Sequence, residues 1–273
     1  KPITIGNLLV YESSIPIDST CIINVMAILN EDTIYKSSAF LFLDDIKTSN
    51  NLSAHITGKE EYKNLIDSAF LSIPTVCINT AFPFSVIDTI GPKEVSSNII
   101  FILPNHTTKS ISIKCGLQTW GGSPSNPKKN YKLEFKSAYG PSKFNFDLFK
   151  SEDDKLVKAA TKFDKLLLRA GSQDGLNAEY GNEAEAQYIK NRFVYDVVLE
   201  LGLPAPHGFF THVFINNKYA GVYHLMEAQD EFFFKTYFFN SYKKDSIEIR
   251  KNRGYANQPV NPTYYNTLLA YSN

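Results

Sequence analysis

This sequence has few cysteines and no excess of charge of one sign. Its 273 residues include three cysteines, and 28 Lys and Arg residues balance 28 Asp and Glu residues. This balance argues against a protein that binds nucleic acid or acidic lipid through bulk electrostatics, because neutralising many phosphates requires a basic surface. Any anionic ligand must therefore be held by a local group of cations.

Long hydrophobic runs are missing as well. No stretch approaches the roughly 18 to 20 consecutive apolar residues that a membrane-spanning helix needs, so we expect no membrane span in this chain. Cys21, Cys77 and Cys115 lie far apart in apolar, strand-like surroundings with no CxxC pair. We interpret them as buried core residues, and the pattern leaves one disulfide open.

Hydrophobic periodicity predicts short strands mixed with a few helices. The alternation of elements is irregular, which favours an α+β fold over a doubly wound sheet. The helix expected at 183–201 carries one apolar stripe and stops at Gly202, and Asn216 with Asn217 predicts a β-hairpin turn. Strands are expected at 4–10, 20–29, 38–43, 75–79, 98–103, 110–117, 130–135, 165–168, 209–215, 219–225 and 246–250, and helices at 60–71, 183–201, 231–239 and 262–270.

A Gly-rich segment followed by lysines, residues 116–132, is the first candidate for a site. Exposed backbone N–H groups beside the ammonium groups of Lys128, Lys129 and Lys132 are what a phosphate pocket needs, although a solvated hairpin with surface lysines has the same pattern. Strand alternation places Lys132 on the same face as Glu134. If a lysine reaches a ligand, Lys129 or Lys132 is the candidate.

Two further groups of charges follow. Arg169 and Asp174 lie at the end of an apolar strand, where either a site or a structural ion pair can form. Arg192 and Asp196 are i, i+4 neighbours on the predicted helix, which by itself indicates an ordinary helix-face pair.

Carboxylates also gather after the predicted hairpin. Glu227 and Asp230 leave a strand and enter a helix, so both can point into a cleft, while Asp230 can equally be the N-cap of that helix. Further on, the amide oxygen of Asn252 can bind a metal ion or shape a turn.

Three histidines raise a competing hypothesis, a zinc-dependent hydrolase. His207, His212 and His224 lie close in the sequence, near Glu227. They lack HExxH or any other tight ligand spacing, and isolated histidines in strands are usually structural. This hypothesis is therefore the weakest of those considered.

Several motifs follow one another along the chain: PKKNYKLEF (127–135), YGPSKFNFDLF (139–149), LLLRAGSQD (166–174), YIKNRFVYDVVLELGLPAPHGFF (188–210) and INNKYAGVYHLMEAQDEFF (215–233). In this order they resemble the CotH kinase family of spore-coat-type atypical protein kinases, especially its long, secreted bacterial branch. A separate segment, residues 15–45, resembles the end of a chitobiase/β-hexosaminidase C-terminal-type β-sandwich.

The resemblance implies an α+β chain with an atypical protein-kinase-like domain. Such a domain binds ATP with Mg2+ or Mn2+ and transfers the γ-phosphate to Ser or Thr of a secreted or cell-surface bacterial protein. We expect a partial β-sandwich segment at 1–46, a linker and helix at 47–71, and the kinase-like domain at 72–273. That domain is expected to be incomplete, because the chain ends inside a predicted helix.

Matching motif to motif assigns roles to individual residues. Nucleotide binding falls to Lys129, Lys132, Arg169, Asn191 and Arg192. Catalysis falls to Asp230 and Glu227, with Asp230 as the principal carboxylate, and metal binding falls to Asp230 and Asn252.

Three departures from the family pattern support an alternative function. Gln118 and Trp120 stand where the family commonly has basic residues, and Asn252 stands where it has Asp. Each change removes charge from an ATP or metal site. The alternative is a catalytically silent, pseudokinase-like binding or scaffold module on a secreted protein. The sequence specifies neither the protein substrate nor the oligomeric state.

Overall fold

The computed structural model describes residues 14, 16–29, 32–48, 52, 54–81, 93–104, 111–121, 128–150, 154–171, 174 and 187–238. The chain divides into two compact units, Lys1–Glu227 and Ala228–Asn273. Strands dominate and helices are few, which agrees with the predicted α+β class. The elements expected at 4–10, 246–250 and 262–270 lie outside the described residues, as does Asn252. Among the described helices, none combines the length and the hydrophobicity needed to span a bilayer.

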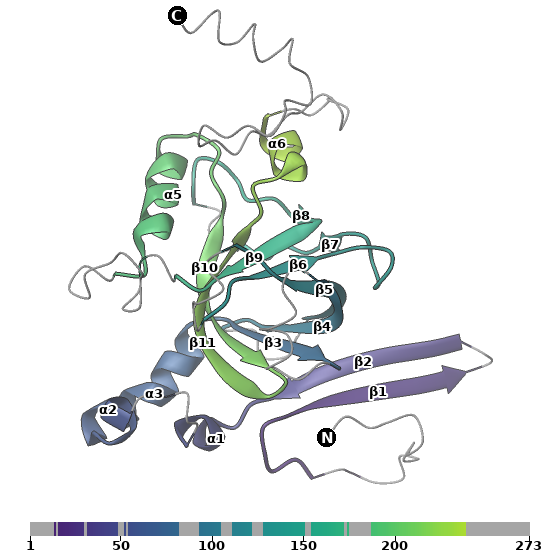
Figure 1. Cartoon of the computed structure of the whole chain (residues 1–273), viewed down its shortest axis with the longest axis vertical. Helices are drawn as coiled ribbons and strands as arrows, with labels where there is room; N and C mark the ends of the chain where they lie inside the picture. The colour runs from purple at the N-terminus through teal and green to yellow at the C-terminus, as the bar shows by residue number, and fades with distance from the viewer. Residues whose placement is uncertain are drawn as a thin grey trace, which may run out of the picture. The chain divides into compact units, whose positions relative to one another are not determined.

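A closed barrel forms the centre of the first unit (Figure 1). Neighbouring strands pair antiparallel, except that β3 and β10 run parallel and close the barrel. The strand order is β10 (Gly208–Ile215), β11 (Lys218–Glu227), β9 (Lys165–Arg169), β6 (Tyr131–Glu134), β5 (Ile111–Thr119), β4 (Val95–Ile102) and β3 (Thr75–Thr80).

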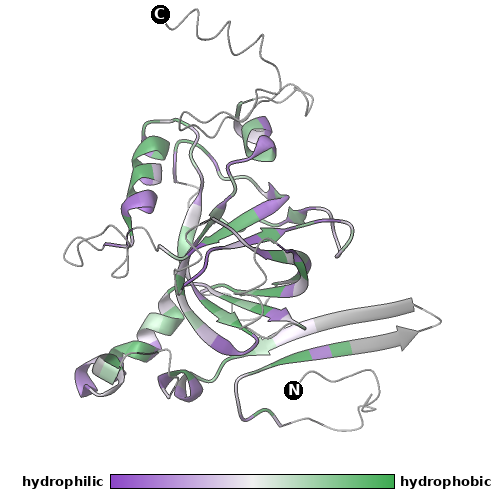
Figure 2. Ribbon diagram, in the orientation of Figure 1, coloured by the Kyte–Doolittle hydropathy of each residue, from purple (hydrophilic) through white to green (hydrophobic). Residues whose placement is uncertain are grey.

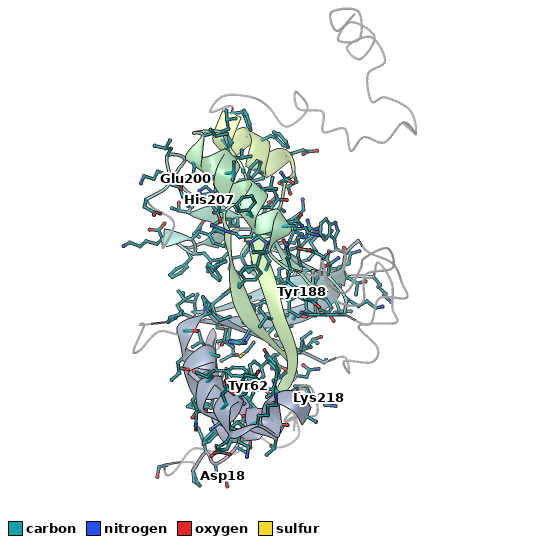
Figure 3. All side chains as sticks on the ribbon, turned by 90° about the vertical axis from the view of Figure 1, so that its left-hand side faces the viewer. Asp18, Tyr62, Tyr188, Glu200, His207 and Lys218 are labelled. Atoms are coloured by element: carbon teal, nitrogen blue, oxygen red, sulfur yellow. The ribbon has the colours of Figure 1, made fainter. Side chains whose placement is uncertain are left out.

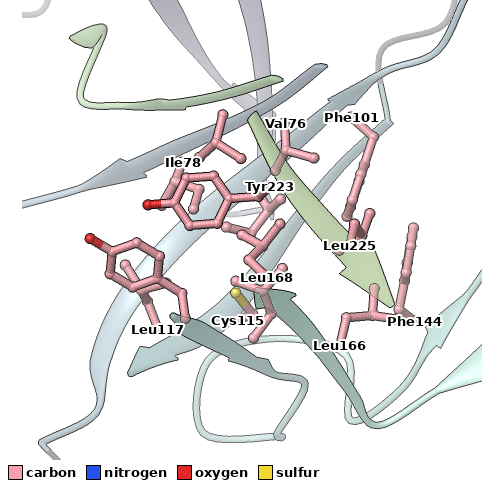
Figure 4. Packing of buried hydrophobic residues seen from close by; sticks show 14 of the residues in the cluster. Val76, Ile78, Phe101, Cys115, Leu117, Phe144, Leu166, Leu168, Tyr223 and Leu225 are labelled. Atoms are coloured by element: carbon pink, nitrogen blue, oxygen red, sulfur yellow. The ribbon is translucent and has the colours of Figure 1, made fainter. Parts of the chain in front are cut away.

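Alternate side chains from these strands fill the barrel interior (Figure 4). Val76, Leu117 and Leu168 are completely buried there, as expected for inward-facing positions of a small barrel. A short ribbon of β7 (Phe144–Asn145) and β8 (Lys162–Phe163) adds aromatic rings to this core, and Phe144 stacks on Phe101 with ring centroids 5.2 Å apart.

The cysteines are free thiols, and two of the three are core residues as predicted. Cys77 and Cys115 are buried, whereas Cys21 is partly exposed. Burial raises the pKa of the Cys77 thiol to about 12 and raises the pKa of Cys115 as well.

The N-terminal region contains a two-stranded antiparallel sheet of β1 (Cys21–Leu29) and β2 (Asp32–Phe40). The strand expected at 38–43 is therefore wrong in its bounds, since β2 starts earlier and ends before Leu41. Helix α1 (Leu43–Lys47) follows the sheet, and the segment expected as linker and helix, 47–71, contains α2 (Ala54–Thr57). The Thr20 N–H donates to Asp45 Oδ2 over 2.6 Å and fastens the base of the hairpin to α1. The partial β-sandwich segment expected at 1–46 stays a prediction.

Helix α3 (Glu60–Ser72) packs against the outside of the barrel, close to the bounds predicted for it. Its Phe70 stacks on His212 with ring centroids 4.1 Å apart and meets Tyr219 edge-on at 5.1 Å. His212 Nδ1 lies 2.9 Å from Tyr219 Oη, and Nε2 lies 3.2 Å from the Ala69 carbonyl oxygen. We call Phe70, His212, Phe214 and Tyr219 the α3 cluster.

The hairpin between β10 and β11 turns at the two asparagines that predicted it. Asn216 and Asn217 have φ values of 48° and 67°, the left-handed pair of a type I′ turn. The α3 cluster lies towards this turn, and α5 (Lys190–Glu200) lies towards the other end of the same two strands (Figures 1 and 3).

Helix α5 is shorter at its start than the sequence predicts. The described residues before Lys190 are not helical, because Tyr188 has a φ of 60°. The end is as predicted: Gly202 has a φ of 75°, and the Leu203 N–H donates to the Val198 carbonyl oxygen over 3.1 Å, which is a Schellman cap.

The apolar stripe of α5 is largely exposed, although such a stripe ordinarily faces a core. Phe193 and Val197 are 64% and 43% exposed, whereas Leu199 is buried. Figure 2 shows hydrophobic and hydrophilic residues along this helix. Polar contacts at its first turn therefore contribute substantially to its attachment to the barrel.

Candidate functional site

A cavity of about 340 Å³ lies within the first unit, beside the first turn of α5. This volume is at the lower end of the range for small-molecule sites. Its lining comes from β9, β10, β11, α5 and the segments next to them, and consists of Lys128, Arg169, Ala170, Gly171, Asp174, Tyr188, Asn191, Arg192, Phe210, Val222 and His224. The cations among these residues make it a candidate anion site.

Lys128 is the lysine of the Gly-rich segment that reaches this cavity. Its Nζ donates to the Val222 carbonyl oxygen and lies 4.3 Å from the centroid of the Tyr223 ring. Burial lowers the pKa of Lys128 to about 8, so the ammonium form still predominates at neutral pH. The next residues fasten the segment to β9, since Asn130 Oδ1 accepts the Ala170 N–H over 2.7 Å.

The predicted lysines lie elsewhere. Lys132 Nζ lies 2.6 Å from Glu134 Oε1, which confirms that these two side chains share a face, and Lys136 pairs with the same carboxylate. Burial acts to raise the pKa of Glu134, but hydrogen bonds from Lys132 and Lys136 hold it at about 2. The ammonium group of Lys132 is thus paired with the Glu134 carboxylate. Lys129 is described but does not line the cavity.

Arg169 and Asn191, both predicted as nucleotide ligands, meet at the cavity. With the Asn191 amide oriented so that its oxygen faces Arg169, that oxygen accepts hydrogen bonds from Nη2 over 2.6 Å and from Nη1 over 3.0 Å. The amide fixes the direction of the guanidinium without neutralising it. Arg169 therefore presents a full positive charge at the cavity wall.

Arg192 forms the predicted pair with Asp196 and also reaches the barrel. Its Nε donates to Asp196 Oδ2 over 2.9 Å, Nη2 donates to Asp196 Oδ1, and Nη1 donates to the Gly208 carbonyl oxygen. The pair thus holds α5 against the start of β10. Arg192 also lines the cavity, and its role in nucleotide binding stays a prediction.

Asp174 positions the first turn of α5 from a distant part of the chain. Its Oδ2 accepts the Lys190 N–H over 3.0 Å, and its Oδ1 lies 3.2 Å from Lys190 Nζ. Burial acts to raise the pKa of Asp174, but the hydrogen bonds from Lys190 hold it below its usual value. The carboxylate therefore satisfies a helix N-terminus whose own N-cap, Ile189, has no capping side chain.

The histidines of the zinc hypothesis have separate roles. His212 belongs to the α3 cluster, and His224 lines the cavity. His207 is completely buried, with Nε2 2.8 Å from the Val157 carbonyl oxygen and Nδ1 3.3 Å from Glu227 Oε2 (labelled in Figure 3). In the described part of the chain, no three His, Cys, Asp or Glu side chains gather to hold a metal ion.

Glu227, predicted as catalytic, is buried at the end of β11. Its Oε2 accepts the His207 N–H over 2.9 Å, and its own N–H donates to the His207 carbonyl oxygen over 3.0 Å. These bonds join β11 to the residue preceding β10. The carboxylate is not among the groups that line the cavity, so its catalytic role stays a prediction.

Asp230 belongs to the second unit and caps α6 (Glu231–Phe238). Its Oδ1 accepts the N–H groups of Phe232 over 3.0 Å and Phe233 over 3.2 Å. The N-cap alternative is therefore confirmed. The catalytic and metal-binding roles of Asp230 stay predictions, and those of Asn252 concern a residue outside the described ranges.

Among the basic side chains that line the cavity, Lys128 and His224 are the two that motif matching did not select. Lys128 was one step from a predicted residue, but no sequence pattern shows which of two adjacent lysines turns towards β11. For His224, the sequence offers only an isolated histidine in a strand.

Comparison with known proteins shows to which family the chain belongs. The family model described as CotH kinase protein matches residues 117–271, which is more than half of the chain and includes every residue that lines the cavity. No curated protein matches the chain. The match does not extend to residues 15–45, where the β-sandwich resemblance lies. The chain belongs to the CotH kinase protein family.

Proposed function

We propose that this chain is a CotH-like protein kinase that uses ATP and a divalent metal, and transfers the γ-phosphate to Ser or Thr of a secreted or cell-surface protein. The observation that carries the proposal is the convergence of Lys128, Arg169 and Arg192 on one cavity. A chain with no net charge concentrates three cations there, as a polyphosphate ligand requires.

Each of the three cations has a distinct geometry for phosphate oxygens. Arg169 is aimed by Asn191 and Arg192 is held by Asp196, so neither guanidinium needs to reorganise when an anion arrives. Lys128, from the segment before β6, supplies a compact ammonium that is held at β11 by the Val222 carbonyl oxygen. Phosphoryl transfer is largely a matter of positioning and charge neutralisation, and this set supplies both.

The residues fit the nucleotide phosphates better than they fit a metal ion. The described residues hold no cluster of metal-ligating side chains, so the metal in this proposal rests on the family and on Asp230 and Asn252. When bound, a divalent ion neutralises phosphate charge. Asp230 is proposed to accept the proton of the substrate hydroxyl.

Calorimetry with ATP in the presence of Mg2+ or Mn2+, followed by labelled phosphate transfer and phosphoamino-acid analysis, tests the proposal. Asp230→Asn should reduce transfer by about 100-fold or more, while keeping the helix cap because asparagine caps well. Glu231→Gln, which changes the next carboxylate on α6, is the matched control and should transfer phosphate normally. Absence of ATP binding with both metals, or full transfer by Asp230→Asn, would refute the proposal.

The alternative of a catalytically silent module is favoured by positions that lack the charge common in the family. Gln118 lies directly opposite Lys132 in the β5–β6 pair, so a position where the family commonly carries positive charge is neutral on the barrel wall. Asn252 removes a second charge. ATP binding by the wild-type protein without any phosphate transfer would support this alternative over the kinase.

A further inference from the structure

His224 occupies an unusual position at the cavity wall. It is 5% exposed and lies on β11 between Phe210 of β10 and Arg169 of β9, the residues that pair with it in register. Its ring centroid lies 5.3 Å from that of Phe210. Among the described residues, no group hydrogen-bonds to its Nε2 atom.

An unpartnered buried ring nitrogen destabilises a fold by about 1 to 3 kcal/mol. An apolar side chain at position 224 would avoid that loss. The chain is close on this side of the ring: a Cβ atom at Gly208 would lie 2.4 Å from the Leu225 carbonyl oxygen and 2.9 Å from His224 Nε2. The other two buried histidines of the barrel strands and their flanks, His207 and His212, have partners for both ring nitrogens.

Charged groups lie near His224 on β9 and α5, whereas β10 contributes the apolar Phe210. Arg169 approaches from β9, and Arg192 with Asp196 from α5, while Lys128 and Asp174 lie further along the cavity wall. Burial and the positive charges of Arg192 and Arg169 lower the pKa of His224 to about 3. The imidazole is therefore neutral in the ligand-free cavity at any physiological pH.

We propose that His224 is the proton-coupling residue of this cavity: when an anion binds beside Arg169 and Arg192, the imidazole takes up one proton from solvent. The bond formed is N–H at the unprotonated ring nitrogen, and the positive charge created is balanced by the anion. The inference rests on the proposed function, because it takes the ligand to be the phosphate end of a nucleotide.

The physical basis is the reversal of one of the two effects that keep His224 neutral. A bound anion offsets the guanidinium charges, so protonation becomes easier, and the imidazolium in turn attracts the anion. By linkage, each proton taken up per ligand makes affinity rise by up to about tenfold for every pH unit of acidification. The cavity therefore binds anions more tightly in an acidic medium than at neutral pH.

The test is calorimetric titration of tripolyphosphate at pH 5.5 and 6.5 in pairs of buffers with different ionisation enthalpies. In this pH range Lys128 is protonated before and after binding, so it does not contribute. The protons that tripolyphosphate itself exchanges are common to wild type and His224→Gln. We expect the wild type to take up at least about 0.3 proton more per ligand than His224→Gln, and to gain threefold or more in affinity relative to it on acidification.

His212→Gln is the matched control, since it removes a buried histidine of β10 that lies outside the cavity. It should behave as wild type. Equal proton uptake by wild type and His224→Gln, with both binding, overturns this inference and leaves the proposed function intact. If tripolyphosphate does not bind the wild type at either pH, both are overturned.

A measurement on the wild type alone covers the case in which His224→Gln fails to fold. Sulfate carries a fixed charge between pH 5.5 and 6.5, so a change in its binding over this range reports protons on the protein. We expect sulfate to raise the melting temperature more at pH 5.5 than at pH 6.5. An equal rise at both pH values overturns the inference.

Discussion

The α3 cluster and the cation-lined cavity both include residues of β10 and β11, but their buried histidines have different surroundings. In the α3 cluster, His212 stacks on Phe70 at 4.1 Å and has a partner for each ring nitrogen. In the cavity, His224 has an unpartnered Nε2 among the described residues, beside a space of about 340 Å³. The first region is closely packed, whereas the second holds the side chains of Lys128, Arg169 and Arg192 next to an open space. That difference is why we propose the cavity as the ligand site.

Phe70→Ala, in the α3 cluster, should have the largest effect, a loss of stability. Deleting a buried aromatic ring leaves a cavity, so the free energy of unfolding should fall by about 3 kcal/mol in denaturant titration. Leu71→Ala, at the neighbouring position that is 69% exposed, should change it by less than about 0.5 kcal/mol. Equal losses in the two variants would mean that α3 does not contribute a packed core.

A smaller effect, confined to binding, should follow from Lys128→Met. Removing a charged hydrogen-bonding group typically costs about 1.5 to 3 kcal/mol, so ATP affinity measured by calorimetry should fall roughly 10- to 100-fold. Lys129→Met is the control, with the same charge change at a residue outside the cavity wall. A larger loss in Lys129→Met would restore the sequence-based choice of lysine and remove Lys128 from the site.

The smallest effect should be a loss of stability caused by His224 below pH 6.5. His224 has a pKa of about 3 when folded and an ordinary value near 6.5 when unfolded, so below pH 6.5 the unfolded state binds the extra proton. The wild type should therefore lose about 1 kcal/mol of stability per pH unit between pH 6 and 5 from this residue. His224→Leu should show a shallower loss in chemical denaturation at the two pH values. Identical pH dependence in the two proteins would show that His224 is not held neutral.

Local patterns predicted those parts of the molecule that local physics determines. Asn216 and Asn217 turn the chain because both tolerate positive φ, and Gly202 ends α5 for the same reason. The strand at Lys165–Arg169 follows from its apolar run. The start of α5 was misplaced because Asp174, a residue distant in the sequence, provides its cap.

The site was predictable only in part. Motif order located Arg169, Asn191 and Arg192, which the fold brings to one cavity. It did not distinguish Lys128 from Lys129 and Lys132, because the reach of a side chain outside a strand depends on the neighbouring strand, here β11. It also gave no role to His224, since the cost of an unpartnered ring nitrogen is visible only once burial is known.

The parallel pairing of β3 with β10, which closes the barrel, affects how short a segment of this protein can fold on its own. The family match begins at residue 117, inside β5, yet β5 needs β4 and β10 needs β3. A fragment starting at residue 117 would expose two unpaired strand edges, a common cause of aggregation. The residues from Thr75 to the start of β5 carry none of the family motifs, but they form β3 and β4, which pair with β10 and β5. We therefore expect autonomous folding to require a longer segment than the one by which the family is identified.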